Sequence, residues 1–103
     1  MLRIEEHRES IVATIDRPDA ENRLNAELLT KLQQLFTDLS DTSVPQKVLV
    51  LNATGPDFSL GRQRSSNPQS LSEVRNEFEL IQATNDLLYD LPLVTVSALQ
   101  GRV

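Results

Sequence analysis

Between Asn25 and Ser40, apolar residues recur at intervals of three and four, with polar residues between them. This spacing predicts an amphipathic helix that buries one apolar stripe against the rest of the domain. The stripe consists of Leu24, Leu28, Leu32, Leu35, Phe36 and Leu39. Asn25 is a suitable N-cap, because its side-chain oxygen can accept a hydrogen bond from an N–H of the first turn. We therefore expect this helix to form one layer of the core.

A second helix is predicted from Leu71 to about Leu91. Ser70 and Glu73 have the spacing of a capping box. Pro92 ends the helix, because proline lacks the N–H that the helical pattern needs. The apolar positions at helical spacing are Leu71, Val74, Phe78, Ile81, Leu88 and Leu91. We expect this stripe to face the core as well.

The remaining apolar runs are short and predict strands. Residues 2–8 alternate loosely and are followed, after a weak turn signal, by the β-prone residues 11–15, which predicts a hairpin. Residues 47–52 and 93–99 are continuous apolar runs, typical of strands that are covered on both faces. The order is thus strand, strand, helix, strand, loop, helix, strand. Strands that alternate with helices predict an α/β fold with mostly parallel strands and two main helices.

Composition narrows the class of protein. A chain of 103 residues corresponds to one domain, residues 1–103, and 39% apolar content speaks against disorder. Without cysteine there is no disulfide scaffold and no thiolate zinc site. The formal net charge of −5 disfavours nucleic-acid binding, which needs a basic face. No run of about 18 apolar residues predicts a membrane span. We expect a cytoplasmic protein that engages neither nucleic acid nor membrane.

The positive charges are unevenly placed. Lys31 and Lys47 are the only lysines among ten cations, and the others are arginines, whose planar guanidinium suits phosphate and carboxylate groups. Residues 58–72 contain no acid, yet Arg62 and Arg64 lie there. This loop is locally basic in an acidic chain. It is interpreted either as a solvated loop or as a loop that contacts an anion.

Side-chain chemistry has little support in this sequence. His7 is the only histidine, and we interpret it as a surface residue because a metal site would need further ligands. The pairs Glu73 and Glu77, and Asp86 and Asp90, have helical spacing, at which carboxylates are usually solvated. With three glycines in the chain there is no phosphate-binding glycine motif. No metal site is expected.

Backbone chemistry is better supported, at residues 58–62. The segment runs from an extended stretch through Gly61 into a polar region. Glycine allows a turn after which N–H groups can converge on one point. Such groups can stabilise a developing oxyanion. Gly61 can also be an ordinary turn residue, so the pattern alone leaves both readings open.

Four segments, taken in order, resemble the N-terminal half of the crotonase superfamily, the enoyl-CoA hydratase/isomerase family. The resemblance covers essentially the whole chain. The matching segments are residues 15–25, with Arg-Pro before a helix start; residues 47–55, an apolar strand with a small-residue turn; residues 57–63, a Phe-x-x-Gly loop; and residues 91–101, a strand leading to Gln-Gly where the family has Asn-Gly.

The resemblance implies a fold and an activity. The fold is a spiral of repeated strand-strand-helix units, of which this chain is the N-terminal portion. The ligand is a coenzyme A thioester, bound as substrate and not as a permanently held cofactor, and it passes through an enolate-like intermediate. The backbone N–H of Arg62, directly after Gly61, is implied as one oxyanion donor. The identity of the Arg62 side chain would matter less, because the donor belongs to the backbone.

The resemblance also implies which residues lie along the coenzyme A moiety. They come from the segment before the first helix and from the loop around Gly61. They are Asn22, Arg23, Leu24, Leu60, Gln63, Arg64 and Ser65. Four arginines are implied as candidate phosphate partners. They are Arg17, Arg23, Arg62 and Arg64.

The sequence departs from the family pattern at three points. Gln63 stands where the family usually has aspartate, and Arg23 replaces a small residue. The sequence reaches Val103 before the family's second oxyanion donor and its usual catalytic carboxylates. We therefore expect part of a lyase or isomerase of fatty acid metabolism that is inactive by itself.

Two other functions stay open. The first is a non-catalytic oligomerising or partner-binding module derived from the same fold, because half of a spiral would expose sheet edges and apolar faces. A homo-oligomer or a complementing chain would then cover those faces. The second is an unrelated small α/β domain, which would be a stable monomer that melts cooperatively.

Overall fold

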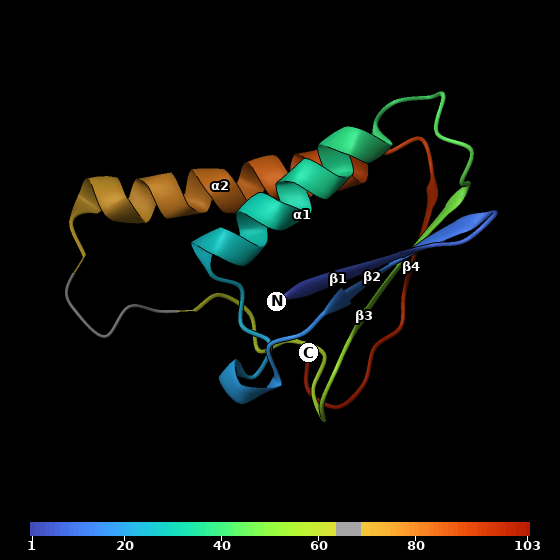
Figure 1. Ribbon diagram of the computed structural model, residues 1–103. Helices are drawn as coiled ribbons and strands as arrows, with labels where there is room; N and C mark the ends of the chain where they lie inside the picture. Colours follow the sequence, from blue (N-terminus) through green and yellow to red (C-terminus); the bar gives the residue numbers. More distant parts are fainter. Residues whose placement is uncertain (64–68) are drawn as a thin grey trace.

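The computed structural model describes residues 1–63 and 69–103 and has two layers, a four-stranded sheet with both helices on one side of it (Figure 1). The strands lie in the order β1-β2-β3-β4, with β1 antiparallel to β2 and the other pairs parallel. The bounds of the strands are Leu2–Glu6 for β1, Ser10–Ile15 for β2, Val48–Ala53 for β3 and Val94–Ser97 for β4. The predicted α/β class, the N-terminal hairpin and the parallel pairing are confirmed.

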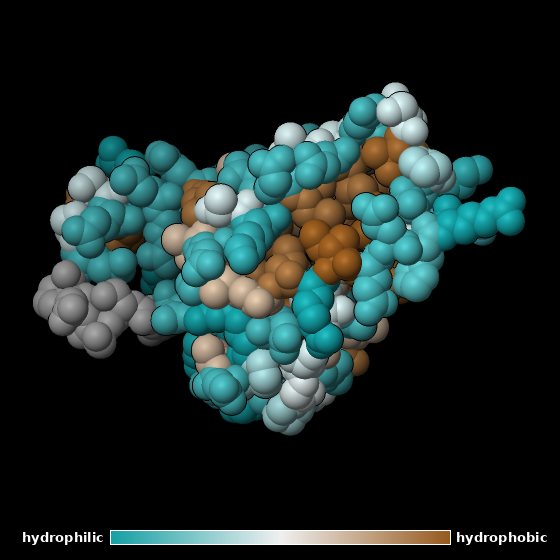
Figure 2. Space-filling model, viewed as in Figure 1, coloured by the Kyte–Doolittle hydropathy of each residue, from teal (hydrophilic) through white to brown (hydrophobic). Residues whose placement is uncertain are grey.

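Helix α1, Ala26–Leu39, forms the centre of the core as its periodicity predicts. Its buried residues are Leu28, Leu29, Leu32, Leu35, Phe36 and Leu39. They pack on the buried side chains of Ile11, Ala13 and Leu49 from β2 and β3. Asn25 caps the helix, with Leu28 N–H donating to its Oδ1 at 2.8 Å. The charged side chains on the outer side of α1 appear as hydrophilic surface in Figure 2, beside brown apolar surface.

Helix α2, Leu71–Tyr89, is far less buried than its apolar stripe predicts. Thr84 is the only buried residue in it, and the side chains of Leu71 and Phe78 are exposed. The prediction that the whole stripe faces the core is therefore wrong. The reason is that α2 packs chiefly on α1 and reaches the core mainly near its end, where Leu91 is buried. Of the described residues, neither helix is long and apolar enough to cross a membrane.

Strand β4 corrects a second expectation. All four of its residues are exposed, including Val94 at 64%, although the sequence indicates a covered strand. It lies at the edge of the sheet and, among the described residues, pairs only with β3. Its valines share the face of the sheet opposite the helices with Val48 and Val50 of β3. On the helix side of β3, Leu49 is buried in the core. On the opposite side, Val48 and Val50 are only partly buried.

Candidate functional site

The segment that follows β2 and the loop that follows β3 meet in space, although they are far apart in sequence. Leu24 and Arg62 form a parallel β-bridge. Leu24 N–H donates to the carbonyl of Gly61 at 2.8 Å, and Gln63 N–H donates to the carbonyl of Leu24 at 2.8 Å. These are the two segments that the sequence analysis places along a ligand. The bridge brings them together beside the N-terminus of α1.

The geometry of the bridge determines where the N–H of Arg62 points. In a parallel bridge, one residue bonds to both neighbours of its partner, so the partner's own N–H points away from the pair. Among the described residues, the Arg62 N–H has no hydrogen-bond acceptor. Gly61 precedes it at φ +87°, a conformation that favours glycine. The Arg62 N–H therefore points away from the bridge, and its predicted role as an oxyanion donor stays a prediction.

Asn22 anchors this arrangement from the interior. Asn22 is 1% exposed, and its backbone adopts φ +52°. Its Nδ2 donates to the carbonyl oxygens of Thr54, at 2.7 Å, and Asp57, at 2.9 Å, while its Oδ1 accepts from Arg17 N–H at 2.8 Å. Ser59 Oγ adds a hydrogen bond to the Asn22 carbonyl at 2.8 Å. Every polar atom of the Asn22 side chain is thus engaged in holding the turns on which the site rests.

Two arginines lie beside the bridge. Arg17 donates from Nη2 to Gln63 Oε1 at 2.9 Å and from Nη1 to the carbonyl of Arg23. Arg23 donates from Nη1 to the carbonyl of Leu60 at 3.2 Å, and its Nε lies 3.6 Å from Glu21 Oε1. A guanidinium has five N–H donors, so each side chain retains donors beyond these contacts. Their predicted contact with an anion stays a prediction.

The side chain of Arg62 has a different partner, on α2. Its Nη1 lies 2.7 Å from Glu77 Oε1, and its Cζ lies 5.1 Å from the centre of the Phe78 ring. The sequence does not predict this contact, because from spacing alone Glu77 is interpreted as half of a solvated carboxylate pair with Glu73. The only feature of the sequence that hints at this ion pair is that an acidic helix follows a basic loop without acidic residues. The guanidinium thus faces a carboxylate of its own chain.

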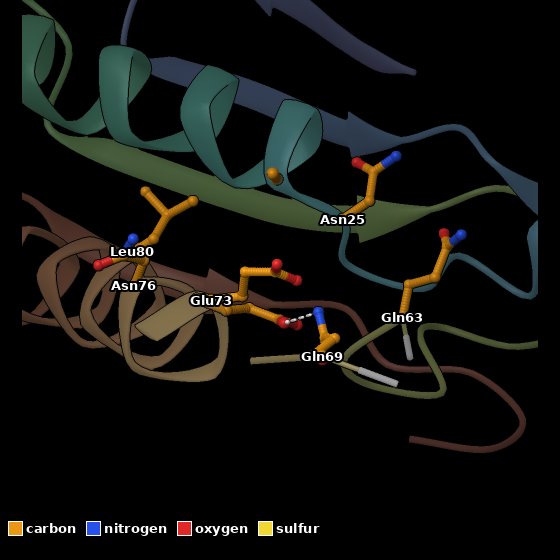
Figure 3. A pocket seen from close by; sticks show the side chains of 8 residues that line it. Asn25, Gln63, Gln69, Glu73, Asn76 and Leu80 are labelled. Carbon is orange, nitrogen blue, oxygen red and sulfur yellow. Dashed lines mark hydrogen bonds between the residues drawn. The ribbon is translucent and has the colours of Figure 1, made fainter. Parts of the chain in front are cut away.

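Two cavities adjoin at Gln63, which lines both. One, of about 560 Å³, is lined by Arg23, Leu60, Arg62 and Gln63. The other, of about 480 Å³, lies between α2 and the start of α1 and is lined by Asn25, Ala26, Gln63, Gln69, Glu73, Asn76, Glu77 and Leu80. Figure 3 shows Glu73 and Asn76 on the α2 side of this second cavity, with Asn25 and Gln63 opposite.

The other predicted site residues are placed as follows. Arg64 and Ser65 lie outside the described residues, so their predicted roles stay predictions. His7 is exposed, with Nε2 3.6 Å from Glu5 Oε2. Within residues 1–63 and 69–103, no three histidine or acidic side chains are grouped closely enough to hold a metal ion.

Comparison with known proteins gives matches in structure only. No protein-family model and no curated protein sequence matches this chain. An enoyl-CoA hydratase from Bacillus anthracis superposes on it with a TM-score of 0.88 at 20% identity, over 97% of this chain and 40% of that one. An enoyl-CoA hydratase from Mycobacterium smegmatis gives a TM-score of 0.87 at 24% identity, over 95% and 39%. Pseudomonas aeruginosa DspI gives 0.86 at 26% identity, over 97% and 41%.

These matches show the fold. The chain has the architecture of the N-terminal part of those proteins, and it spans about two fifths of their length. The structural agreement extends over nearly all of the chain.

Proposed function

We propose that this chain, whose fold is that of the N-terminal part of the crotonase superfamily, binds coenzyme A thioesters as part of an enoyl-CoA hydratase/isomerase-like enzyme. The observation that carries the proposal is the Arg62 N–H, which follows Gly61 at φ +87° and has no acceptor among the described residues. The names of two of the similar structures support the substrate class, since both are enoyl-CoA hydratases.

The proposed chemistry follows from what a fixed N–H can do. As a thioester is converted toward an enolate, negative charge gathers on its carbonyl oxygen. A preorganised donor stabilises that charge more than it stabilises the starting thioester, by about 3 kcal/mol where one donor has been removed in other enzymes. Hydration or isomerisation also needs a group that moves a proton. One donor leaves most of the barrier in place, so we propose that the isolated chain does not turn over substrate.

The coenzyme A portion is proposed to lie in the cavity lined by Arg23, Leu60, Arg62 and Gln63. Arg23 lines this cavity, and Arg17 contacts Gln63 at its border, so these two guanidinium groups are proposed to supply the positive charge for its phosphates. Leu60 and Gly61 shape the loop, while Leu24 fixes it through the bridge. Under this proposal the complete enzyme is a cytoplasmic lyase or isomerase of fatty acid metabolism that carries no permanently bound cofactor.

The experiment is a titration of the full 103-residue chain with acetyl-CoA labelled with ¹³C at the thioester carbonyl, followed by NMR. A polarised carbonyl moves downfield on binding, and we expect that movement with the wild-type chain. Gly61→Ala should abolish it, because alanine disfavours φ +87°. Thr37→Ala, on the exposed side of α1, is the control. Binding without a carbonyl shift, or no binding at all, contradicts the proposal.

A second function is favoured by one observation, the edge strand β4. Val94 and Val96 of this strand are 64% and 46% exposed, and an edge strand offers unpaired N–H and C=O groups. No residue of β4 is charged, so nothing there opposes pairing with the same strand of a second copy. An oligomerising module would be supported by a discrete dimer in sedimentation equilibrium that Val96→Lys dissociates. A monomer at all concentrations would contradict it.

A further inference from the structure

We propose that Glu77 is a positioning residue, which holds the Arg62 N–H donor in place through the Arg62 side chain. This inference rests on the proposed thioester site. It also revises the expectation that the Arg62 side chain has little importance. The backbone supplies the donor, and the side chain anchors the loop that carries it.

The bridge to Leu24 holds Arg62 from one side only. It consists of two hydrogen bonds made by the neighbours of Arg62, namely the carbonyl of Gly61 and the N–H of Gln63. The Gly61 carbonyl and the Arg62 N–H belong to one peptide plane, so the bond from Leu24 N–H sets the direction of the Arg62 N–H. The bridge is isolated, outside the named strands, so no adjoining ladder bond in the described part of the chain reinforces it. A second point of attachment limits movement of the loop, and a firmly held donor is the more effective one.

The ion pair with Glu77 provides that second attachment. Arg62 Nη1 lies 2.7 Å from Glu77 Oε1, and the guanidinium also packs over the ring of Phe78. The other carboxylate oxygen of Glu77 accepts from Gln69 Nε2 at 3.4 Å. Glu77 itself sits within a regular helix turn, so its position is set by α2. The loop is therefore tied to the sheet side by Leu24 and to the helix layer by Glu77.

The surroundings of this pair distinguish it from an ordinary surface contact. The side chains of Arg62 and Glu77 are 26% and 19% exposed, whereas those of Lys31 and Glu27 on α1 are 49% and 64% exposed and lie 3.8 Å apart. Solvent screens an exposed pair strongly and a mostly covered pair less. The ion pair of Arg62 and Glu77 can therefore keep the two side chains in one arrangement. The ion pair of Lys31 and Glu27 is the exposed control.

The test uses the full chain with ¹³C-carbonyl acetyl-CoA at saturation, and compares Glu77→Gln, Arg62→Met, Arg62→Lys and Lys31→Met. We expect Glu77→Gln and Arg62→Met to lose at least about half of the bound carbonyl shift at saturation, and Glu77→Gln to leave the Kd within about threefold of the wild-type value. Arg62→Lys, which keeps the positive charge, should recover part of the shift. Lys31→Met should leave it unchanged.

A double variant separates positioning from direct contact, because Glu77 also lines the neighbouring cavity. If Glu77 acts through Arg62, the variant with both Glu77→Gln and Arg62→Met loses no more shift than either single change. Additive losses would show that Glu77 touches the ligand itself and would overturn the inference. A full shift in Glu77→Gln would also overturn it, with the thioester site intact. No shift in the wild-type chain would instead refute the thioester site.

Should Glu77→Gln prevent folding, the exchanged pair Arg62→Glu with Glu77→Arg keeps the ion pair with reversed polarity. A folded exchanged chain that retains the carbonyl shift supports positioning by the pair, whereas loss of the shift in a chain with the wild-type melting temperature refutes it. Circular dichroism provides that melting temperature for every variant.

Discussion

Arg102 holds Asp57 through both its backbone and its side chain. The Arg102 N–H donates to Asp57 Oδ1 at 2.8 Å, and Nη2 donates to Oδ2 at 2.8 Å. Phe58, which follows Asp57, donates its N–H to the carbonyls of Gln100 and Arg102, at 2.9 and 3.1 Å. Gly101 allows this approach, since a Cβ there would lie 2.0 Å from the carbonyl oxygen of Pro56. The segment after β4 is thus fixed to the turn that leads into the Gly61 loop.

The Asp57 contact makes the stability of the fold depend on pH. Hydrogen bonds from Arg102 lower the pKa of the Asp57 carboxyl below its ordinary value of 3.8. A carboxyl whose pKa is lower in the folded state than in the unfolded state stabilises the fold. This stabilisation is fully present above the unfolded-state pKa and is lost as pH falls through the folded-state pKa. We expect wild-type melting temperature to fall as pH drops below about 4. Asp57→Asn should melt lower at neutral pH and change less on acidification.

A second carboxyl must be separated from this effect. Ser43 lowers the pKa of the Asp41 carboxyl through hydrogen bonds, the backbone N–H of Ser43 lying 2.9 Å from Asp41 Oδ1. Asp41→Asn is therefore the matched control, in an exposed loop that is remote from Arg102. If Asp57→Asn kept the whole wild-type pH dependence while Asp41→Asn removed it, the assignment to Asp57 would be wrong.

Replacing Asn22 should be the most costly single change near the site. Asn22→Ala leaves two buried carbonyls and one N–H without their partner and places alanine at φ +52°, so we expect a loss of about 4 kcal/mol in the free energy of unfolding. Asn22→Gly loses the same bonds without the backbone strain and should cost about 1 kcal/mol less. Urea denaturation measures both. Equal losses would show that the positive φ carries no strain.

The sequence predicts the core of this fold well because the relevant signals are local. Periodicity and the Asn25 cap locate α1, and the apolar runs locate β3 and β4 in the order that the sheet shows. It predicts burial poorly for Phe78 and Val94, because exposure depends on which element lies opposite and not on spacing along the chain. An apolar stripe has the same sequence pattern whether the helix packs on a sheet or only on one side of another helix.

The site divides in the same way. Gly61 and the Arg62 N–H are expected from a glycine-containing loop and a family resemblance. The structure shows the positive φ of Gly61 and the bridge at Arg62, while the oxyanion role stays a prediction. The pairing of Arg62 with Glu77 does not follow, since it joins residues on different elements whose separation is set only by the packing of α2 on α1. The buried role of Asn22 was missed for a similar reason, because its partners come from two segments, one after β2 and one after β3.

The two helix caps should contribute unequally although both use a side-chain oxygen. Asn25 Oδ1 accepts from Leu28 N–H at 2.8 Å at the start of a helix whose first turn is already buried at Leu28. Ser70 Oγ accepts from Glu73 N–H at 3.2 Å before an exposed first turn that can fray. We expect Asn25→Ala to cost about 1 kcal/mol and Ser70→Ala less than about 0.5 kcal/mol in urea denaturation. Equal costs would mean that the start of α2 is held more firmly than its exposure indicates.

Salt dependence tests whether Arg23 meets a phosphate. Arg23→Met removes a positive charge that lines the cavity proposed for coenzyme A, so at low ionic strength the Kd for coenzyme A should rise about tenfold. At about 0.5 M salt the wild-type chain should lose most of this advantage, because charges are then screened over a few ångströms. Isothermal titration calorimetry at both salt concentrations gives the comparison, with Lys31→Met as the control for net charge.

The same substitution distinguishes two roles of the guanidinium. Arg23 Nη1 also donates to the carbonyl of Leu60, so Arg23→Met could weaken binding by loosening the loop. A loosened loop would weaken binding by the same factor at every salt concentration, because the lost bond to a neutral carbonyl is local and little screened. A factor that shrinks toward one as salt rises therefore identifies a phosphate contact, and a constant factor identifies support of the loop that carries the Arg62 donor.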